Sequence, residues 1–170
     1  GAAQGFGKGI AEEMCKEGAI VVIADMNIAG AEATAAEITA ETGAATLAVA
    51  ANVSDEDSVR AMVEKTVLTF GGLDVFVNNA GIVRAGSLEE MTKQNFELVT
   101  SVNYTAYFLC AKYASAVMKL ERAASPDYMT DIVEINSKSG LSGSNKNFAY
   151  AGSKFGGIGL TQSFAMELAP

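Results

Sequence analysis

The 170-residue chain contains no histidine and no tryptophan, and it has only two cysteines and two prolines. Without histidine, Ser-His-Asp and Cys-His catalysis are excluded, as are nearly all catalytic zinc sites, so no metal is expected. Cys15 and Cys110 lie in segments with a helical pattern and lack a metal-type spacing. We expect them to be reduced thiols packed in helix faces. Any proton transfer must use Asp, Glu, Lys, Tyr or Cys.

Positive charge is also scarce. There are 12 Lys and Arg residues against 20 Asp and Glu, a net charge of −8, and no basic cluster. Nucleic acid is therefore not an expected partner, because phosphate binding needs concentrated positive charge. No apolar run approaches the ~20 residues of a membrane helix, and no signal peptide is seen. We expect a globular, cytoplasmic protein without a membrane partner.

Short β-branched runs alternate with longer helical patterns, which is typical of βαβ units in a doubly wound parallel sheet of the Rossmann type. We expect strands at 19–25, 44–49, 73–77 and 131–136. Gly18, Gly43 and Gly71 are expected to end the first three helices. Ser54 and Asp57 resemble a capping box for the third helix. A fourth helix is expected from Thr92 to about residue 120, then a loop over 121–130 and a last helix over 148–168.

The two ends of the chain suggest a piece of a larger fold. A glycine-rich loop starts at residue 1, although such a loop works where a strand delivers it to the sheet. A further strand is also expected after residue 170. We interpret residues 1–170 as a single NAD-binding, α/β domain that lacks its first strand and its C-terminal part.

The opening loop, G-A-A-Q-G-F-G at 1–7, precedes a helix. Glycines let the backbone approach a pyrophosphate, and a helix N-terminus offers unpaired N–H groups to it. A glycine-rich turn without a ligand has the same appearance. Asp25 ends the next strand, and an acid about 20 residues after the loop can accept hydrogen bonds from an adenosine ribose. It would repel a 2′-phosphate, so NAD is favoured over NADP; the alternative is a solvated carboxylate at a strand end.

Tyr150 and Lys154 are four residues apart on a predicted helix, so they share a face. A free tyrosine titrates near about 10, and a nearby ammonium stabilises the phenolate, which improves the group as an acid–base catalyst. Such pairs also occur by chance in many helices.

Ser137 and Asn103 accompany this pair. Ser137 follows the strand at 131–136, at the end where parallel sheets place their ligands, and could hydrogen-bond a substrate oxygen. Serine there is more often a turn residue. Asn103 lies within an apolar helical stripe and needs partners, either as a structural link or in a water relay; spacing alone favours the link. The stripe consists of Phe96, Val99, Tyr107 and Cys110.

These motifs together resemble the short-chain dehydrogenases/reductases over essentially the whole chain. Besides the glycine loop, the matching pieces are N-N-A-G at 78–81, S-V-N at 101–103, I-N-S-K-S-G at 135–140 and Y-A-G-S-K at 150–154, in the family's order and spacing. The resemblance implies that Tyr150 is the general acid–base and that Lys154 assists it and holds the nicotinamide ribose. Ser137 would orient the substrate oxygen, and Asn103 would anchor a proton-relay water.

The resemblance also implies a set of cofactor contacts. Besides Tyr150 and Lys154, these are Gly1, Gly5, Phe6, Gly7, Asp25, Asn52, Val53, Asn79, Ala80 and Gly81. Asn52 stands where the family often has an acid that contacts adenine, and an amide can still make that hydrogen bond.

Within the family, residues 135–140 and 150–163 resemble most the members that oxidise a hexitol phosphate such as sorbitol 6-phosphate. Lys138 could help to hold the anionic substrate, or it could be an ordinary exposed lysine. Free polyols, hydroxysteroids and 3-oxoacyl thioesters are alternative substrates, and a non-catalytic NAD-binding module is an alternative role. By the same resemblance, the two longest helices would pack against copies of themselves in a homotetramer.

Overall fold

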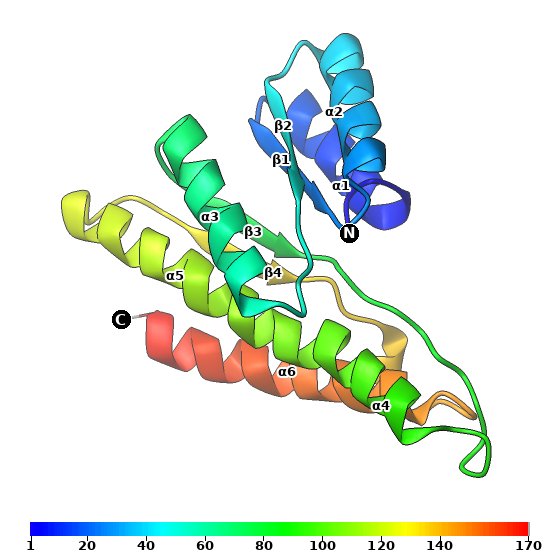
Figure 1. Cartoon of the computed structure of the whole chain (residues 1–170). Coiled ribbons are helices and arrows are strands. Elements are labelled where there is room, and N and C mark those ends of the chain that lie inside the picture. Colours follow the sequence, from blue (N-terminus) through cyan, green and yellow to red (C-terminus); the bar gives the residue numbers. More distant parts are fainter. Residues whose placement is uncertain (170) are drawn as a thin grey trace. The chain divides into compact units, whose positions relative to one another are not determined.

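The computed structural model describes residues 1–169 and divides into two compact units. The first consists of residues 1–71 and the second begins at Gly72. Each unit is an α/β structure built on one pair of parallel strands, and each is described by itself (Figure 1).

In the first unit, two strands are covered by helices (Figure 1). The elements are α1 (Gly5–Lys16), β1 (Val21–Asp25), α2 (Ile28–Thr42), β2 (Thr46–Ala50) and α3 (Glu56–Phe70). β1 pairs in parallel with β2, from Val21 opposite Thr46 to Asp25 opposite Ala50. The core comprises Ala11, Cys15, Ile23, Ala31, Ala35 and Ile38. This register brings the carboxyl ends of both strands to one edge, where ligands of parallel sheets bind.

The second unit repeats the pattern with longer helices. Its elements are β3 (Val75–Asn78), α4 (Lys93–Thr100), the π-helical turn η1 (Ser101–Thr105), α5 (Ala106–Ala124), β4 (Asp131–Glu134), the 3₁₀ turn η2 (Lys138–Gly140) and α6 (Phe148–Leu168). β3 and β4 are parallel, with Asn78 opposite Glu134 at their carboxyl ends. α5 packs on both strands, and α6 lies beside α5 (Figure 1).

The predicted α/β fold is confirmed, with parallel strands alternating with helices. All four predicted strands are present, although each begins or ends one or two residues away from its predicted bounds. Gly18, Gly43 and Gly71 follow their helices with φ values of 93°, 73° and 90°. Only glycine adopts this left-handed conformation readily, which explains why helices end there.

Two predictions about helices are wrong in detail. The N-cap of α3 is Asp55, whose Oδ1 accepts a hydrogen bond from Ser58 N at 2.8 Å, whereas Ser54 N donates to Asn52 Oδ1 in the preceding turn. The single helix expected from Thr92 is divided by the π turn η1, and its continuation α5 runs on to Ala124, into the predicted loop.

The predicted apolar stripe is mostly buried. Val99, Asn103, Tyr107 and Cys110 are all at most 1% exposed, but Phe96 is 44% exposed. Of the helices in residues 1–169, none combines the length and the apolar character needed to cross a membrane.

Candidate active site

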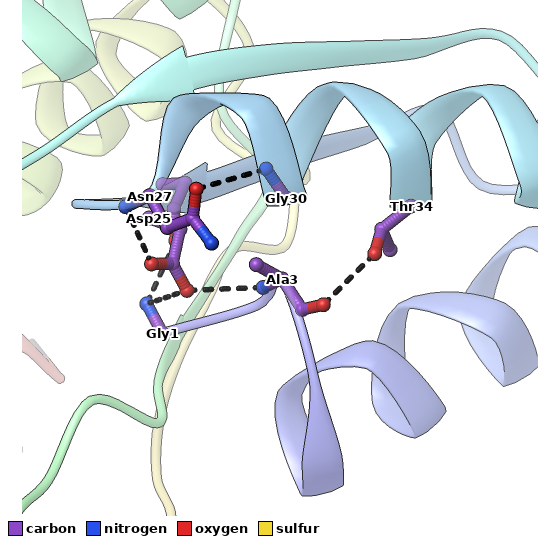
Figure 2. Close-up of polar contacts among 7 residues, drawn as sticks. Gly1, Ala3, Asp25, Asn27, Gly30 and Thr34 are labelled. Atoms are coloured by element: carbon purple, nitrogen blue, oxygen red, sulfur yellow. Dashed lines mark hydrogen bonds and ion pairs between the residues drawn. The ribbon is translucent and has the colours of Figure 1, made fainter.

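In the first unit, the glycine loop is held at the end of β1. Ala2 N donates to Ala24 O at 3.2 Å. Ala3 O accepts from Thr34 Oγ1 of α2 at 2.9 Å (Figure 2). Gly5 starts α1 with a φ of 62°, and beyond its chain neighbours and its own helix backbone no described atom lies within 4 Å of where its Cβ would be. Gly7 is buried and Phe6 is 85% exposed. The loop therefore presents bare backbone at the start of a helix, as an anion site requires.

Asp25 is bound by the main chain around it (Figure 2). Its Oδ2 accepts from Ala3 N at 3.0 Å, its Oδ1 accepts from Asn27 N at 2.9 Å, and the amino group of Gly1 lies 3.6 Å from Oδ2. Burial acts to raise the pKa of Asp25, the main-chain hydrogen bonds from Asn27 and Ala3 act to lower it, and the net shift is downward. The carboxylate is thus kept ionised and is not simply solvated.

Asn52 and Val53 follow β2 at the same edge of the sheet. Ala51 N donates to Asp25 O at 2.9 Å, which brings this segment alongside Asp25. The Asn52 side chain is exposed and its Oδ1 accepts from Ser54 N at 3.1 Å, while Val53 is half-buried. The first unit therefore places Asp25 beside the glycine loop and the segment of Asn52 and Val53 beside Asp25.

In the second unit, Lys154 is the central buried charge. It is 4% exposed, and its Nζ donates to the main-chain oxygen of Ile135 at 2.6 Å, between β4 and η2. Burial lowers the pKa of Lys154, and the nearby Glu134 carboxylate acts in the opposite direction. A buried ammonium with one carbonyl partner keeps donor capacity for further groups.

Tyr150 lies one turn before Lys154 on α6, and Lys154 Nζ is 6.0 Å from the centre of its ring. The ammonium is thus near the ring, as the predicted pair requires. The backbone oxygen of Tyr150 accepts from Ser153 Oγ at 2.7 Å.

Ser137 follows β4 and begins the 3₁₀ turn η2. Its Oγ accepts from Ser139 N at 3.2 Å, and its own N–H donates to Asn136 Oδ1 at 2.7 Å. Gly140 closes the turn against α6, where a Cβ would lie 3.0 Å from Lys154 O and 2.3 Å from Asn136 Oδ1. The bare glycine lets the serine turn approach the helix that carries Tyr150. Lys138 beside it is exposed.

Asn103 is 1% exposed within the π turn and links three segments. Its Oδ1 accepts from Ile82 N at 2.8 Å, and its Nδ2 donates to Ile82 O at 2.9 Å and to Ser153 Oγ at 3.2 Å. Its side chain is therefore a structural link, the alternative that its spacing favoured. Through Ile82 it also fixes the Asn79, Ala80 and Gly81 segment that leaves β3. π turns are frequent at functional sites because the extra residue redirects a side chain.

Sequence reasoning missed Asn136, although it stands inside the quoted I-N-S motif. Its Nδ2 donates to Lys154 O at 3.0 Å and to Glu134 Oε2 at 2.9 Å, while its Oδ1 receives Ser137 N. Asn136 therefore joins the serine turn to α6. The signal available was an amide next to the candidate serine at a strand end.

The second unit therefore brings together Tyr150, Lys154, Ser137, Asn103 and the segment after β3. No cluster of three or more potential metal-binding side chains occurs among residues 1–169.

Comparison with known proteins identifies the family. A family model described as short chain dehydrogenase matches residues 1–170. The 3-oxoacyl-acyl-carrier-protein reductase FabG of Staphylococcus aureus (strain Mu50) is 39% identical over 173 residues, covering 99% of this chain and 66% of that protein. The sorbitol-6-phosphate 2-dehydrogenase of Escherichia coli (strain K12) is 35% identical over 170 residues, covering 99% of this chain and 64% of that protein. The chain thus spans about two thirds of the length of these relatives.

Solved structures agree. The structure of the sorbitol-6-phosphate 2-dehydrogenase SrlD from Erwinia amylovora has a TM-score of 0.89 at 35% identity, covering 99% of this chain and 64% of that one. A short chain dehydrogenase from Mycobacterium avium has a TM-score of 0.94 at 32% identity, covering 99% and 61%.

Proposed function

Because the chain belongs to the short-chain dehydrogenase family, we propose that it transfers hydride between NAD and a secondary alcohol, giving the matching ketone. The observation that carries the proposal is the placement of Lys154. It is buried beside Tyr150 and bonded to Ile135 O, and Asn136 ties it to the turn of Ser137.

The proposed roles follow from what each side chain can offer. Tyr150 accepts the hydroxyl proton of the alcohol, and Ser137 hydrogen-bonds the same oxygen as charge develops there. The ammonium of Lys154 stabilises the phenolate form of Tyr150. NAD, when bound, accepts the hydride from the carbinol carbon. We propose that Asn103 also orders a relay water next to Lys154, in addition to its structural link to Ile82 and Ser153.

The residues of the first unit fit a dinucleotide. The bare backbone at Gly5 suits a pyrophosphate, flanked by Gly1, Phe6 and Gly7. Asp25 is an ionised acceptor at a strand end, which suits a ribose hydroxyl and disfavours a 2′-phosphate. We therefore propose a preference for NAD over NADP. Asn52 and Val53 would contact the adenine side, and Asn79, Ala80 and Gly81 the adenosine side; Lys154 would hold the nicotinamide ribose.

For the substrate, we propose a hexitol phosphate such as sorbitol 6-phosphate. The likeness of residues 135–140 and 150–163 to enzymes of this specificity supports it, as do two relatives that carry that name. Lys138 is exposed next to Ser137 and is available to an anionic group.

A second candidate is reduction of a 3-oxoacyl thioester. The observation that favours it is the 39% identity to a 3-oxoacyl-acyl-carrier-protein reductase, against 35% to the sorbitol-6-phosphate 2-dehydrogenase.

A coenzyme and substrate panel tests these proposals. Full-length protein is mixed with NAD or NADP and with sorbitol 6-phosphate, free sorbitol or a hydroxysteroid, or with the reduced coenzymes and acetoacetyl-CoA, and absorbance at ~340 nm follows the nicotinamide. We expect the highest kcat/KM with NAD and sorbitol 6-phosphate. Highest activity on acetoacetyl-CoA would support the second candidate. Tight NAD binding without turnover of any secondary alcohol or ketone would point to a non-catalytic module.

We also propose a homotetramer in which α5 and α6 pack against copies of themselves. Supporting this, Phe108 and Leu120 on α5, and Phe155 and Met166 on α6, are between 46% and 83% exposed. Sedimentation of the full-length protein would show four copies; a monomer at micromolar concentration would contradict the proposal.

A further inference from the structure

Glu134 ends β4 behind the candidate active site, where no role has been assigned to it. Its Oε2 accepts from Asn136 Nδ2 at 2.9 Å and lies 3.4 Å from Thr161 Oγ1 of α6. Its Oε1 is buried and makes no hydrogen bond within the described residues. A buried carboxylate oxygen without a hydrogen bond destabilises the folded state, so packing alone does not explain a glutamate at this position.

The surface of α6 is shaped to receive this carboxylate. A Cβ at Gly157 would lie 2.1 Å from Glu134 Oε1 and 2.8 Å from its Cδ. Any other residue at position 157 would displace the side chain. Gly159, on the same helix, has no atom within 4 Å of its Cβ position. Gly157 therefore forms a seat for Glu134 against the backbone of α6, one turn after Lys154.

Glu134 reaches both catalytic elements through Asn136. The same Asn136 amide that donates to Glu134 Oε2 also donates to Lys154 O at 3.0 Å, and its oxygen receives Ser137 N at 2.7 Å. One hydrogen-bonded bridge thus runs from the half-buried carboxylate to the serine turn and to the lysine backbone. The carboxylate also acts electrostatically on the Lys154 ammonium, whose pKa burial lowers and Glu134 raises.

We propose that Glu134 is a positioning residue of the active site: through Asn136 it orients Ser137 and Lys154, and its negative charge favours the ammonium form of the buried Lys154. The activity part of this inference rests on the proposed function. A neutral lysine would no longer stabilise the phenolate of Tyr150, so loss of the charge behind it would limit catalysis at high pH.

The other ionisable groups around Lys154 are few. α6 carries Tyr150, α5 supplies Tyr107, which is linked to Glu134 through Thr161, and the π turn supplies Tyr104. The turn η2 carries the exposed Lys138, and α4 carries the exposed Lys93 and Glu97, which pair with each other at 3.4 Å. Lys138 is exposed, and Lys93 and Glu97 are exposed and paired with each other. Among these groups, Glu134 is therefore the half-buried carboxylate that can act as the counter-charge of Lys154.

Glu121 supplies a matched control. It is a second glutamate of this unit with a buried, unpartnered oxygen, Oε2, and its Oε1 accepts from Leu73 N at 2.7 Å, before the start of β3. Leu73 and Glu134 are at opposite ends of the paired strands. Glu121→Gln therefore changes a comparable carboxylate at the far end of the sheet.

The experiment compares Glu134→Gln, Glu134→Asp and Glu121→Gln in the full-length protein. Glu134→Gln retains an oxygen for Asn136 but loses the charge. We expect the basic limb of kcat for NAD-dependent oxidation of sorbitol 6-phosphate to move to lower pH, with several-fold loss of kcat above the limb and little change in KM. Glu134→Asp should return the basic limb part of the way to its wild-type pH. Glu121→Gln should leave the limb at its wild-type pH, even where it lowers the thermal stability.

A second readout does not depend on turnover. Lysine side-chain NMR, with the Lys154 signal assigned by Lys154→Arg, should show Lys154 titrating at lower pH in Glu134→Gln than in the wild type. Identical titration of Lys154 in these two proteins would overturn the inference even if the enzyme is active. Absence of turnover with an NMR shift still present would instead count against the proposed function alone.

Discussion

Asp25 in the first unit and Lys154 in the second are both partly or fully buried charges with a lowered pKa, but the lowering has opposite meanings. Main-chain N–H groups surround Asp25, and for an acid a lower pKa favours the charged form. Lys154 has one carbonyl partner and is desolvated, and for a base a lower pKa favours the neutral form. The first unit thus keeps its charge fixed, which suits binding, whereas the second holds a charge that can respond to its surroundings, which suits proton transfer.

Several glycines of the two units differ in the space around their Cβ positions. A Cβ at Gly5 or Gly9 in the first unit would meet no atom within 4 Å. In the second unit, a Cβ at Gly140, Gly156 or Gly157 would come within 2.1–2.5 Å of a neighbouring side chain. Gly5 and Gly9 therefore leave backbone accessible, while Gly140, Gly156 and Gly157 allow close packing of the helix that carries the catalytic pair.

The largest effect that would sharpen this comparison is expected at Asp25. Asp25→Asn removes the fixed charge and places an amide where N–H groups now donate, so the Kd for NAD should rise by about tenfold to a hundredfold, as for loss of a charged hydrogen bond. At saturating NAD, kcat should change little. Isothermal titration with NAD and NADP checks this, with Asp57→Asn as control, since Asp57 is exposed and pairs with Arg60. An unchanged Kd for NAD would show that Asp25 only holds the glycine loop in place and does not contribute to NAD binding.

A smaller effect is expected at Gly157. Gly157→Ala should displace the Glu134 carboxylate and break its bond to Asn136, lowering the free energy of unfolding by about 1–3 kcal/mol. Gly159→Ala, with open space around it, should be neutral or stabilising by up to about 1 kcal/mol, as for alanine in a helix. Chemical denaturation measures both. In a Glu134→Ala background the cost of Gly157→Ala should disappear; if it persists, the clash lies elsewhere.

The smallest effect concerns the two cysteines, one in each unit. Both are buried; burial raises the pKa of Cys110 to about 12 and raises that of Cys15. Because the thiolate is the reactive form, Cys15→Ala and Cys110→Ala proteins should each label at about pH 8 only when the unit holding the remaining thiol opens. Labelling rates with a thiol reagent thus report the opening of each unit separately. Rapid labelling of native Cys110 would contradict its burial.

The helices, the strands and the short sequence motifs could be predicted from the sequence because they depend on local chemistry. The left-handed glycines, the strand runs and the Tyr150–Lys154 spacing are all local signals. The π turn could not be predicted, because the sequence S-V-N-Y-T is compatible with an ordinary α-helix. The extra residue of the turn accompanies the contacts of Asn103 with Ile82 and Ser153, which are 21 and 50 residues away. Glu134 was likewise missed, since its partners on α6 lie beyond the range of any periodic pattern.

The cap of α3 shows the limit on a smaller scale. Ser54 and Asp55 are both good N-caps, and the choice between them was made by the turn at Asn52, whose Oδ1 receives Ser54 N. Neighbouring candidates of equal propensity are separated only by such contacts.

The central claim is that Tyr150 carries the proton in a hydride transfer to NAD, and the most direct measurement is the turnover of Tyr150→Phe in the full-length protein, on the best substrate of the panel. We predict a fall in kcat of about 10²–10⁴-fold, the usual contribution of general acid–base catalysis, with the Kd for NAD unchanged. Tyr104→Phe, which keeps its ring against Gly156, should retain wild-type turnover. A Tyr150→Phe enzyme with turnover close to that of the wild type would contradict the account.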